Sequence, residues 1–434
     1  MRLYVLAPFV FVATATAAPK LTLEEVTAKA IAGPRVRMVA GDIDAASARV
    51  AEADAARLPR IKITAFGTIS PEIVCVNVEC TETNPRNFQI DFDGLYGSAQ
   101  VDLTQPLYTF GKIAHARRAA RLGVEAQSAL ADETAGDLAV DAARAYWGVK
   151  LARELGFMLD DGIDQIDKAI VRMNARTGAD APSIQDRQRV AVLLAEAKVQ
   201  RADAASGELQ ALAGLRALTG IPDADVDDKP LAALDHKLPV TATSDARPQA
   251  RAAMRGATAA DELAKMAEAY YWPDFAFVAT AVFAKAQGVD DPKTVFANDP
   301  YNRAQGGAVL ALQWTVEPWN VKARVDRARA EARKAHAQSD LAAAGALYDA
   351  ETALAEASGA KRKLDATVEG ETAGRAWVAS ILQADAIGAA EAKDFADAYI
   401  AWFGMKARWA QAAFQWNVAV ARMSRSGGEY RARR

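Results

Sequence analysis

The sequence has 434 residues, of which 51% are hydrophobic and 25% charged, and its formal net charge is −3 at pH 7. Acidic and basic residues are interspersed along the chain, so it has no basic surface of the kind that binds nucleic acid. Nucleic acid is therefore not expected as a partner.

The N-terminus has the residue order of a secretory signal peptide. Arg2 is followed by a mostly apolar run, and small residues precede Pro19. This run is shorter than the about 20 residues that a membrane-spanning helix needs, and no cysteine follows that would take up a lipid. We expect residues 1–17 to be removed and the mature chain to be exported; a buried N-terminal helix or strand is the alternative.

Two long intervals without proline predict long helices. Residues 107–181 and 319–434 contain no proline and are rich in strong helix formers. Residues 110–173 alone would form a helix of roughly 95 Å, which is too long for a compact globule. Their apolar positions are mostly alanine, which suits helices packed side by side in a wall; an alanine-rich coiled coil in a soluble adaptor is the alternative.

Four segments alternate apolar and polar residues and predict strands in two hairpins. They lie near 61–69, 88–105, 275–283 and 308–316, and a change of phase near Gly94 indicates a bulge. Loops rich in Pro, Asn, Asp and Gly are expected at about 71–87 and 285–305. Four strands cannot close a barrel alone, so within lipid several chains would have to share one barrel.

The two cysteines, Cys75 and Cys80, lie in the first of these predicted loops. An exported chain meets an oxidising compartment, which favours a disulfide between them. A metal site is the alternative, although none of the three histidines lies nearby in the sequence.

The order helix, strand, loop, strand, long helix, turn and helix occurs twice, and Leu58-Pro59 in the first copy corresponds to Trp272-Pro273 in the second. Duplication of this kind predicts pseudo-symmetry. The expected segments are a signal peptide at 1–17, a first repeat at 18–220 with its hairpin at about 60–106, a linker at 221–248, a second repeat at 249–424 with its hairpin at about 273–317, and a tail at 425–434.

Aromatic residues gather at three of the four junctions between strands and helices. In hairpins these junctions lie at the same end of the strands, so the rings would form a belt at a membrane interface. Aromatic residues that cap an ordinary β core are the alternative. The predicted interface residues are Tyr108, Phe110, Tyr271, Trp272, Trp314 and Trp319.

Several short motifs, loose one by one but specific in order and spacing, resemble the TolC-like outer-membrane efflux protein family. They are LTLEE at 21–25, ARLP at 56–59, QPLYTFGK at 105–112, the turns at 178–186 and 388–397, and NVAVAR at 417–422. The resemblance implies a mainly α fold with a β-barrel portion: a transmembrane β-barrel completed by trimerisation, continued by a long α-helical barrel in the periplasm.

The same resemblance implies a function and partners. It implies a homotrimer in the outer membrane of a Gram-negative bacterium, surrounded by outer-membrane lipid and bound to a periplasmic adaptor (membrane fusion) protein and an inner-membrane transporter. The expected function is a passive conduit for small molecules or proteins in efflux or type I secretion, without a cofactor. A soluble periplasmic adaptor or scaffold is the alternative.

In the family, acidic residues after the glycine of the second helical turn surround the periplasmic entrance, and these positions correspond to Asp394 and Asp397. Asp186 resembles the acidic partner in the first repeat. A ring of carboxylates would favour cations; solvated aspartates near a helix start are the alternative. Asp385 and Ala390 replace the tyrosine and arginine that hold the family's entrance shut, so the closed state must be held differently or weakly.

No pattern of catalytic residues competes with this interpretation. The sequence has no phosphate-binding glycine loop, no paired histidines and no serine in a nucleophile elbow. We therefore expect no enzyme activity.

Overall fold

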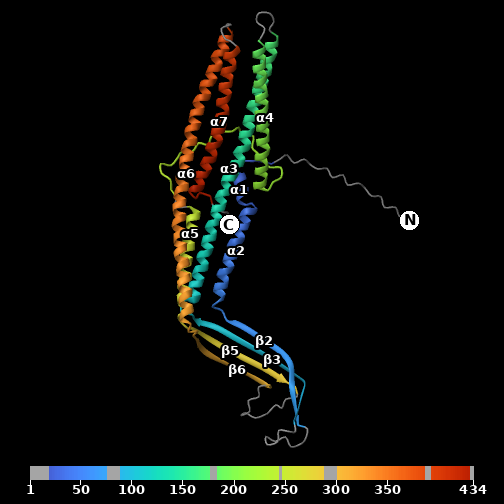
Figure 1. The fold of residues 1–434 in the computed structure, drawn as a ribbon, viewed down its shortest axis with the longest axis vertical. Helices are drawn as coiled ribbons and strands as arrows, with labels where there is room; N and C mark the ends of the chain where they lie inside the picture. Colours follow the sequence, from blue (N-terminus) through green and yellow to red (C-terminus); the bar gives the residue numbers. More distant parts are fainter. Residues whose placement is uncertain are drawn as a thin grey trace, which may run out of the picture. The chain divides into compact units, whose positions relative to one another are not determined.

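The computed structural model describes residues 19–75, 88–175, 183–243, 247–287, 301–386 and 392–430, so the predicted signal peptide lies outside the described residues. The chain forms two compact units (Figure 1). Unit 1 comprises residues 1–42, 127–252 and 340–434, and unit 2 comprises residues 43–126 and 253–339. Each unit draws on both predicted repeats, and the repeats themselves stay a prediction.

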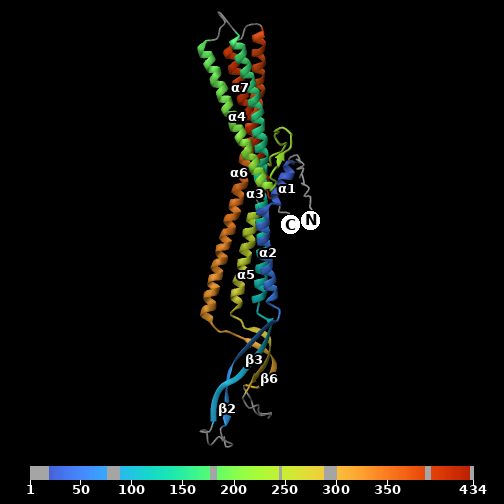
Figure 2. The same cartoon turned by 90° about the vertical axis from the view of Figure 1, so that its right-hand side faces the viewer.

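Long helices occupy the intervals without proline, as predicted. Helix α3 (Lys112–Asn174) has 63 residues and α6 (Pro318–Ala386) has 69. Pro318 is the first residue of α6, a position where its missing N–H costs no hydrogen bond. Helices α4 (Ile184–Thr219) and α7 (Ala392–Ser426) follow them. In unit 1, α4 lies beside α3 and α7 lies beside α6 (Figures 1 and 2).

The core of unit 1 forms where these helices meet the short N-terminal elements. Strand β1 (Lys20–Leu21) pairs in parallel with β4 (Asp225–Val226) of the linker. Thr22 and Glu25 then form a capping box at the start of α1 (Leu23–Ile31). This explains the LTLEE motif. Its two leucines and the following Val26 pack into the core, while its polar residues begin the helix.

Asn417 fixes the linker to α7 and accounts for the NVAVAR motif. It is fully buried; its Oδ1 accepts a hydrogen bond from the backbone N–H of Leu234 at 2.8 Å, and its Nδ2 donates to the carbonyl of Ala232 at 2.8 Å. The neighbouring Trp416 donates from Nε1 to the carbonyl of Leu234. One amide side chain thus replaces the β-sheet partner that this stretch of linker lacks.

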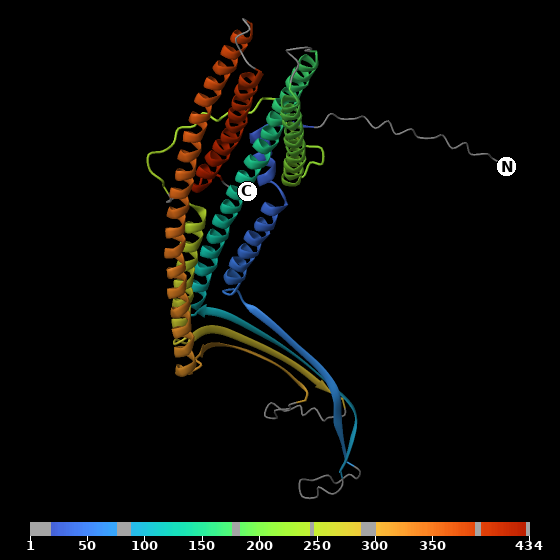
Figure 3. The same cartoon turned by 45° about the horizontal axis from the view of Figure 1, so that its top comes forward.

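Unit 2 contains a sheet of four antiparallel strands with helical segments at one end. The strands are β2 (Arg60–Cys75), β3 (Phe88–Tyr108), β5 (Asp274–Ala286) and β6 (Arg303–Gln313), in the order β2-β3-β5-β6. The helical segments belong to α2 (Pro34–Ala55), α3, α5 (Pro248–Ala269) and α6. Figure 3 shows the strands side by side, with β2 and β3 reaching beyond β5 and β6.

Charged side chains connect the helices of unit 2, and one of them, Glu262, is buried. Glu262 of α5 accepts hydrogen bonds from Arg118 of α3 at 2.6 Å and from Lys265 at 2.7 Å, and it lies 2.7 Å from Nδ1 of His115. Burial of the carboxyl opposes ionisation, but the hydrogen bonds from Lys265, His115 and Arg118 lower the pKa of Glu262 from 4.5 to about 2. His336 of α6 contacts Asp261 of α5 at 2.9 Å, so α5 is bonded to a helix on each side.

The bulge predicted near Gly94 is confirmed. Ser70 pairs with Gly94 and Glu72 pairs with Asp91, so two residues of β3 oppose one residue of β2 between these pairs. That one residue is Pro71, which cannot donate to the ladder and is tolerated at such an irregular position.

Strand limits differ from those predicted. Strand β6 covers 303–313 instead of 308–316, so Trp314 and Val316 follow the strand. Gly306 and Gly307 carry no side chain that could alternate, yet their backbones pair with Ala281 and Thr280. The ladder therefore extends where the side-chain pattern gives no signal.

Candidate functional site

The register of the sheet gathers apolar side chains on one face. Directly paired residues lie on the same face of antiparallel strands; Ile63 pairs with Val101, Val101 with Ala281, and Ala281 with Gly306. The apolar face defined by these rows consists of Ile61, Ile63, Ala65, Gly67, Ile69, Leu95, Gly97, Ala99, Val101, Leu103, Phe275, Phe277, Ala279, Ala281, Phe283, Ala304, Gly306, Ala308, Leu310 and Leu312.

The opposite face, called the polar face below, mixes charged, polar and small side chains. Lys62 pairs with Asp102, and Asp102 pairs with Thr280. The carboxylate of Asp102 accepts hydrogen bonds from Gln100 and from Thr280, both at 2.9 Å. The sheet therefore offers one side to an apolar medium and the other to water.

The apolar face has the length of a membrane-spanning strand. On β5 it runs from Phe275 to Phe283, and Lys285 is the next residue on the same face. A transmembrane strand needs about 9–11 residues, and at about 3.3 Å per residue this run covers about 27 Å. Strands of membrane barrels are tilted by about 35–45°, so about 27 Å of strand rises about 20 Å, which is most of the about 25 Å height of the apolar band.

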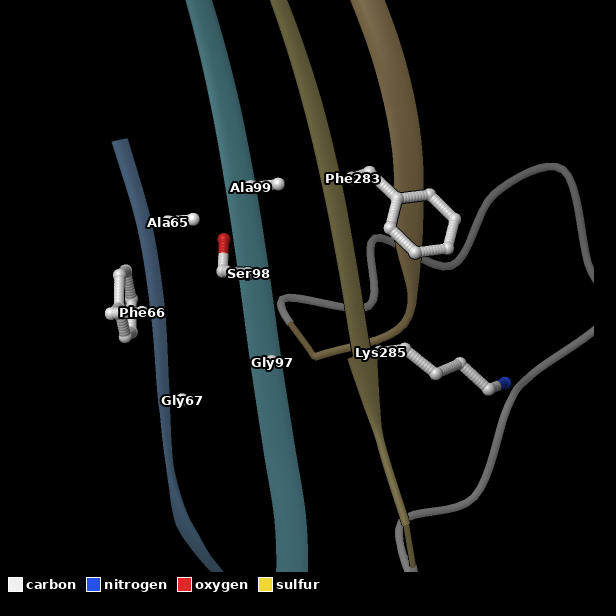
Figure 4. Close-up of a pocket in the computed structure, with 8 residues that line it drawn as sticks. All are labelled: Ala65, Phe66, Gly67, Gly97, Ser98, Ala99, Phe283 and Lys285. Carbon is white, nitrogen blue, oxygen red and sulfur yellow. The ribbon is translucent and has the colours of Figure 1, made fainter. Parts of the chain in front are cut away.

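Small residues hollow the apolar face towards the end that Lys285 marks (Figure 4). Ala65 and Gly67 of β2 lie beside Ala99 and Gly97 of β3, and the open hollow measures about 490 Å³. Phe283 and Lys285 of β5 border it, as the close-up shows. The hollow is shallow and apolar and carries no set of converging catalytic groups.

The two outer strands leave their outer edges free for pairing. Strands β2 and β6 stand at the ends of the strand order, and in the described part of the chain neither pairs with a strand on its outer side. Bare edges are tolerated in water but not in lipid, where the peptide groups find no other partner.

The predicted interface aromatics all lie at one end of the sheet, where β3 and β6 end and β5 begins. The structure brings Tyr108, Phe110 and Trp272 together: Phe110 stacks on Trp272 at 5.7 Å, and Tyr108 meets Phe110 edge-on at 4.7 Å. Tyr271, Trp314 and Trp319 are exposed at the same end, and Trp319 is 82% exposed.

A tight turn positions this aromatic cluster. Phe110 and Gly111 have positive φ angles of 49° and 97°, so the chain passes from β3 into α3 through two successive left-handed residues, a conformation that favours glycine. Lys112 then donates to the carbonyl of Trp272 at 3.0 Å and to Asp274 at 2.9 Å. The QPLYTFGK motif thus joins the end of β3 to the start of β5.

The structure describes the side chains of two of the three predicted pore residues. Asp394 and Asp397 are exposed in the first turns of α7, three positions apart and so on one side of the helix. Asp186 lies in α4, but its side chain and the turns at 176–182 and 387–391 fall outside the described residues. That the three carboxylates approach one another stays a prediction.

The predicted disulfide also lies outside the described residues. Cys75 is the last residue of β2, its side chain is not described, and Cys80 belongs to the undescribed segment 76–87. Within the described ranges, no three His, Cys, Asp or Glu side chains are placed to hold a metal ion. None of the described helices is both long and apolar enough to cross a membrane.

Sequence reasoning missed an aromatic cluster on the polar face. Phe66, Tyr96 and Tyr301 contact one another in a row. Phe66 and Tyr96 occupy the polar positions of their alternating segments, and this exception to the pattern was the available signal.

Comparisons with known proteins agree with this geometry. Residues 31–221 match the family model of the outer membrane efflux proteins. No curated protein sequence matches the chain.

Solved structures match along nearly the whole chain. CusC, studied for folding and transmembrane channel formation, has a TM-score of 0.77 at 15% identity, covering 98% of this chain and 95% of that one. The Campylobacter jejuni CmeC outer membrane channel has a TM-score of 0.75 at 15% identity, with coverages of 95% and 87%. The open MtrE outer membrane channel of Neisseria gonorrhoeae has a TM-score of 0.75 at 19% identity, with coverages of 94% and 88%. Residues 31–221 thus match the outer membrane efflux proteins, and the chain as a whole shares the fold of solved outer membrane channels.

Proposed function

We propose that the protein is the outer-membrane channel of a tripartite efflux or type I secretion system and acts as a passive conduit. The two-faced sheet with free outer edges carries this proposal. Its apolar face faces lipid, its polar face lines the lumen, and the edges of β2 and β6 pair with those of identical neighbours. Three copies then share one barrel, which extends into the periplasm and meets an adaptor protein and an inner-membrane transporter.

Adjacent residues of β2 give a matched test. Ile63 is 70% exposed on the apolar face, and Thr64 points to the polar face. A lysine on the lipid side of a barrel costs about 2–4 kcal/mol at mid-bilayer. Ile63→Lys should therefore reduce the heat-modifiable trimer extracted from membranes by detergent, whereas Thr64→Lys should leave its amount unchanged and alter conductance in planar bilayers.

The alternative, a soluble periplasmic adaptor or scaffold, makes the opposite prediction. Wild-type protein recovered as a monomer from the soluble periplasmic fraction would reject the channel. Equal effects of the two lysines on assembly would show that the sheet faces are not lipid and lumen.

We propose that Asp394, Asp397 and Asp186 constrict the periplasmic entrance. Support comes from the exposed positions of Asp394 and Asp397 on one side of α7 near a turn. Replacing Asp394 and Asp397 by asparagine should lower the cation preference in planar bilayers, because a threefold ring of carboxylates attracts cations. Asp223→Asn, an exposed linker aspartate, is the control, and unchanged selectivity in the double variant would remove the pair from the pore.

We also propose that the six aromatic residues form the periplasmic-side interface belt. Their exposure at one end of the sheet supports this placement. In reconstituted protein, Trp319→Cys labelled with a polarity-sensitive fluorophore should report an interfacial environment. Emission typical of bulk water would contradict the belt at that position.

A further inference from the structure

Three aromatic side chains form a connected cluster on the polar face of the sheet. The rings of Phe66 and Tyr96 lie 5.8 Å apart at 57°, and those of Tyr96 and Tyr301 lie 6.1 Å apart at 84°. Phe66 is 56% exposed and Tyr301 is 40% exposed. Much ring surface is therefore open to whatever fills the space beside this face.

The strand register fixes the side of the sheet on which the cluster lies. Phe66 pairs with Ser98, and Tyr96 pairs with Thr68 on one side and with Ala286 on the other. These neighbours are small or hydroxylated, so they leave the ring faces uncovered. The aromatic rings thus stand among polar side chains and not on the apolar face.

The cluster is distinct from the predicted interface belt. Tyr96 precedes Tyr108 by twelve positions in β3, which corresponds to about 40 Å along the strand. Aromatic girdles of membrane barrels point outward to the lipid interface, whereas Phe66 and Tyr96 point to the polar face. An interface role does not account for their direction.

We propose that Phe66, Tyr96 and Tyr301 bind planar aromatic groups of the cargo inside the channel. This proposal rests on the proposed function, which makes the polar face the lumen. Exposed rings favour offset-stacked and edge-on contacts with other rings and also attract cations over their faces. In a trimer, the same cluster recurs three times at one level, so an aromatic cargo meets several equivalent contacts there.

Current block in planar bilayers tests this site. Tryptophanamide and leucinamide carry the same single positive charge, and only the first has an aromatic ring. For the wild-type channel, tryptophanamide should block at about fivefold lower concentration than leucinamide, the ratio expected from one stacking contact. The double variant Phe66→Leu with Tyr96→Leu keeps apolar bulk but removes the rings. Both probes should block this variant at the same concentration.

Phe283→Leu is the matched control, because Phe283 is an exposed aromatic residue on the apolar face of the same sheet. It should keep the wild-type preference. If the double variant fails to assemble, Phe66→Leu alone replaces it, with a partial loss of preference expected.

The outcomes separate this inference from the proposed function. A wild-type channel that conducts but shows no preference for tryptophanamide overturns the aromatic site and leaves the channel intact. A preference retained without the rings also overturns it. A wild-type protein that never conducts rejects the proposed function and the site with it.

Discussion

The contact between α6 and α7 depends on the absence of a side chain at Gly374. A Cβ at this position would lie 3.0 Å from the Cα of Trp402 and 3.2 Å from its Cβ. These atoms cannot move by side-chain rotation, and the Trp402 indole is also fixed because its Nε1 donates to Glu371 at 3.1 Å. In Gly374→Ala, the two helices must therefore separate by a few tenths of an ångström.

Two opposing terms set the size of the effect. Alanine in place of glycine stabilises a helix interior by about 1 kcal/mol, and overpacking of a close contact costs about 1–3 kcal/mol. Gly374→Ala should therefore destabilise the local packing by about 1 kcal/mol. At Gly345 of the same helix, a Cβ would meet no atom within 4 Å. Gly345→Ala should therefore stabilise the helix without any overpacking cost.

Native-state hydrogen exchange read by mass spectrometry measures this difference locally. Peptides that cover the contact around Gly374 and Trp402 should exchange about fivefold faster in Gly374→Ala, because exchange follows the free energy of local opening. In Gly345→Ala, the same peptides should exchange as in the wild type. Equal or slower exchange at the contact in Gly374→Ala would refute the close packing of these helices.

Three further predictions follow from other parts of the chain. Asn417→Ala leaves backbone groups of the linker without partners, so it should destabilise unit 1 by about 1–3 kcal/mol and speed exchange of linker amides; unchanged protection would contradict it. The pKa of Glu262 is about 2 in the folded protein and 4.5 ordinarily, so its stabilising contribution is complete above pH 4.5 and disappears as the pH falls towards 2. Glu262→Gln should remove that part of the acid dependence of unfolding, and identical acid titrations of variant and wild type would argue against it. Mass spectrometry of unreduced peptides should show Cys75 linked to Cys80, whereas free thiols in fresh protein would exclude the disulfide.

Features that depend on local sequence were predictable. Proline restricts helices by backbone chemistry alone, so the empty intervals predicted long helices where α3 and α6 lie, with Pro318 at the start of α6. Alternation similarly predicted most of β2, β3 and β5, and the phase change at Gly94 predicted the bulge.

Features that depend on pairing between distant segments were not predictable from one sequence. Nothing in the local pattern says that β3 pairs with β5, or that Glu262 meets Arg118. Glycines also make strands hard to predict. Gly306 and Gly307 interrupt the alternation of apolar and polar side chains, and only their pairing with β5 shows that they belong to a strand. The candidate pore residues came from the family resemblance, because exposed aspartates have no local pattern of their own.

Exposed apolar residues on α4 bear on the trimer independently of the sheet. Ile184, Val192 and Val199 are 75%, 65% and 61% exposed, and their spacing puts them within one side of the helix. Full burial of such a side chain stabilises a protein by about 1.5–3 kcal/mol. The contacts within unit 1 do not provide this stabilisation, because the three side chains stay exposed. In the proposed trimer, a helix of a neighbouring copy covers it, so the same association that completes the barrel also buries the helix surface. A trimer held only by its strands would leave the stripe in water, and polar replacements there would then have no effect on assembly.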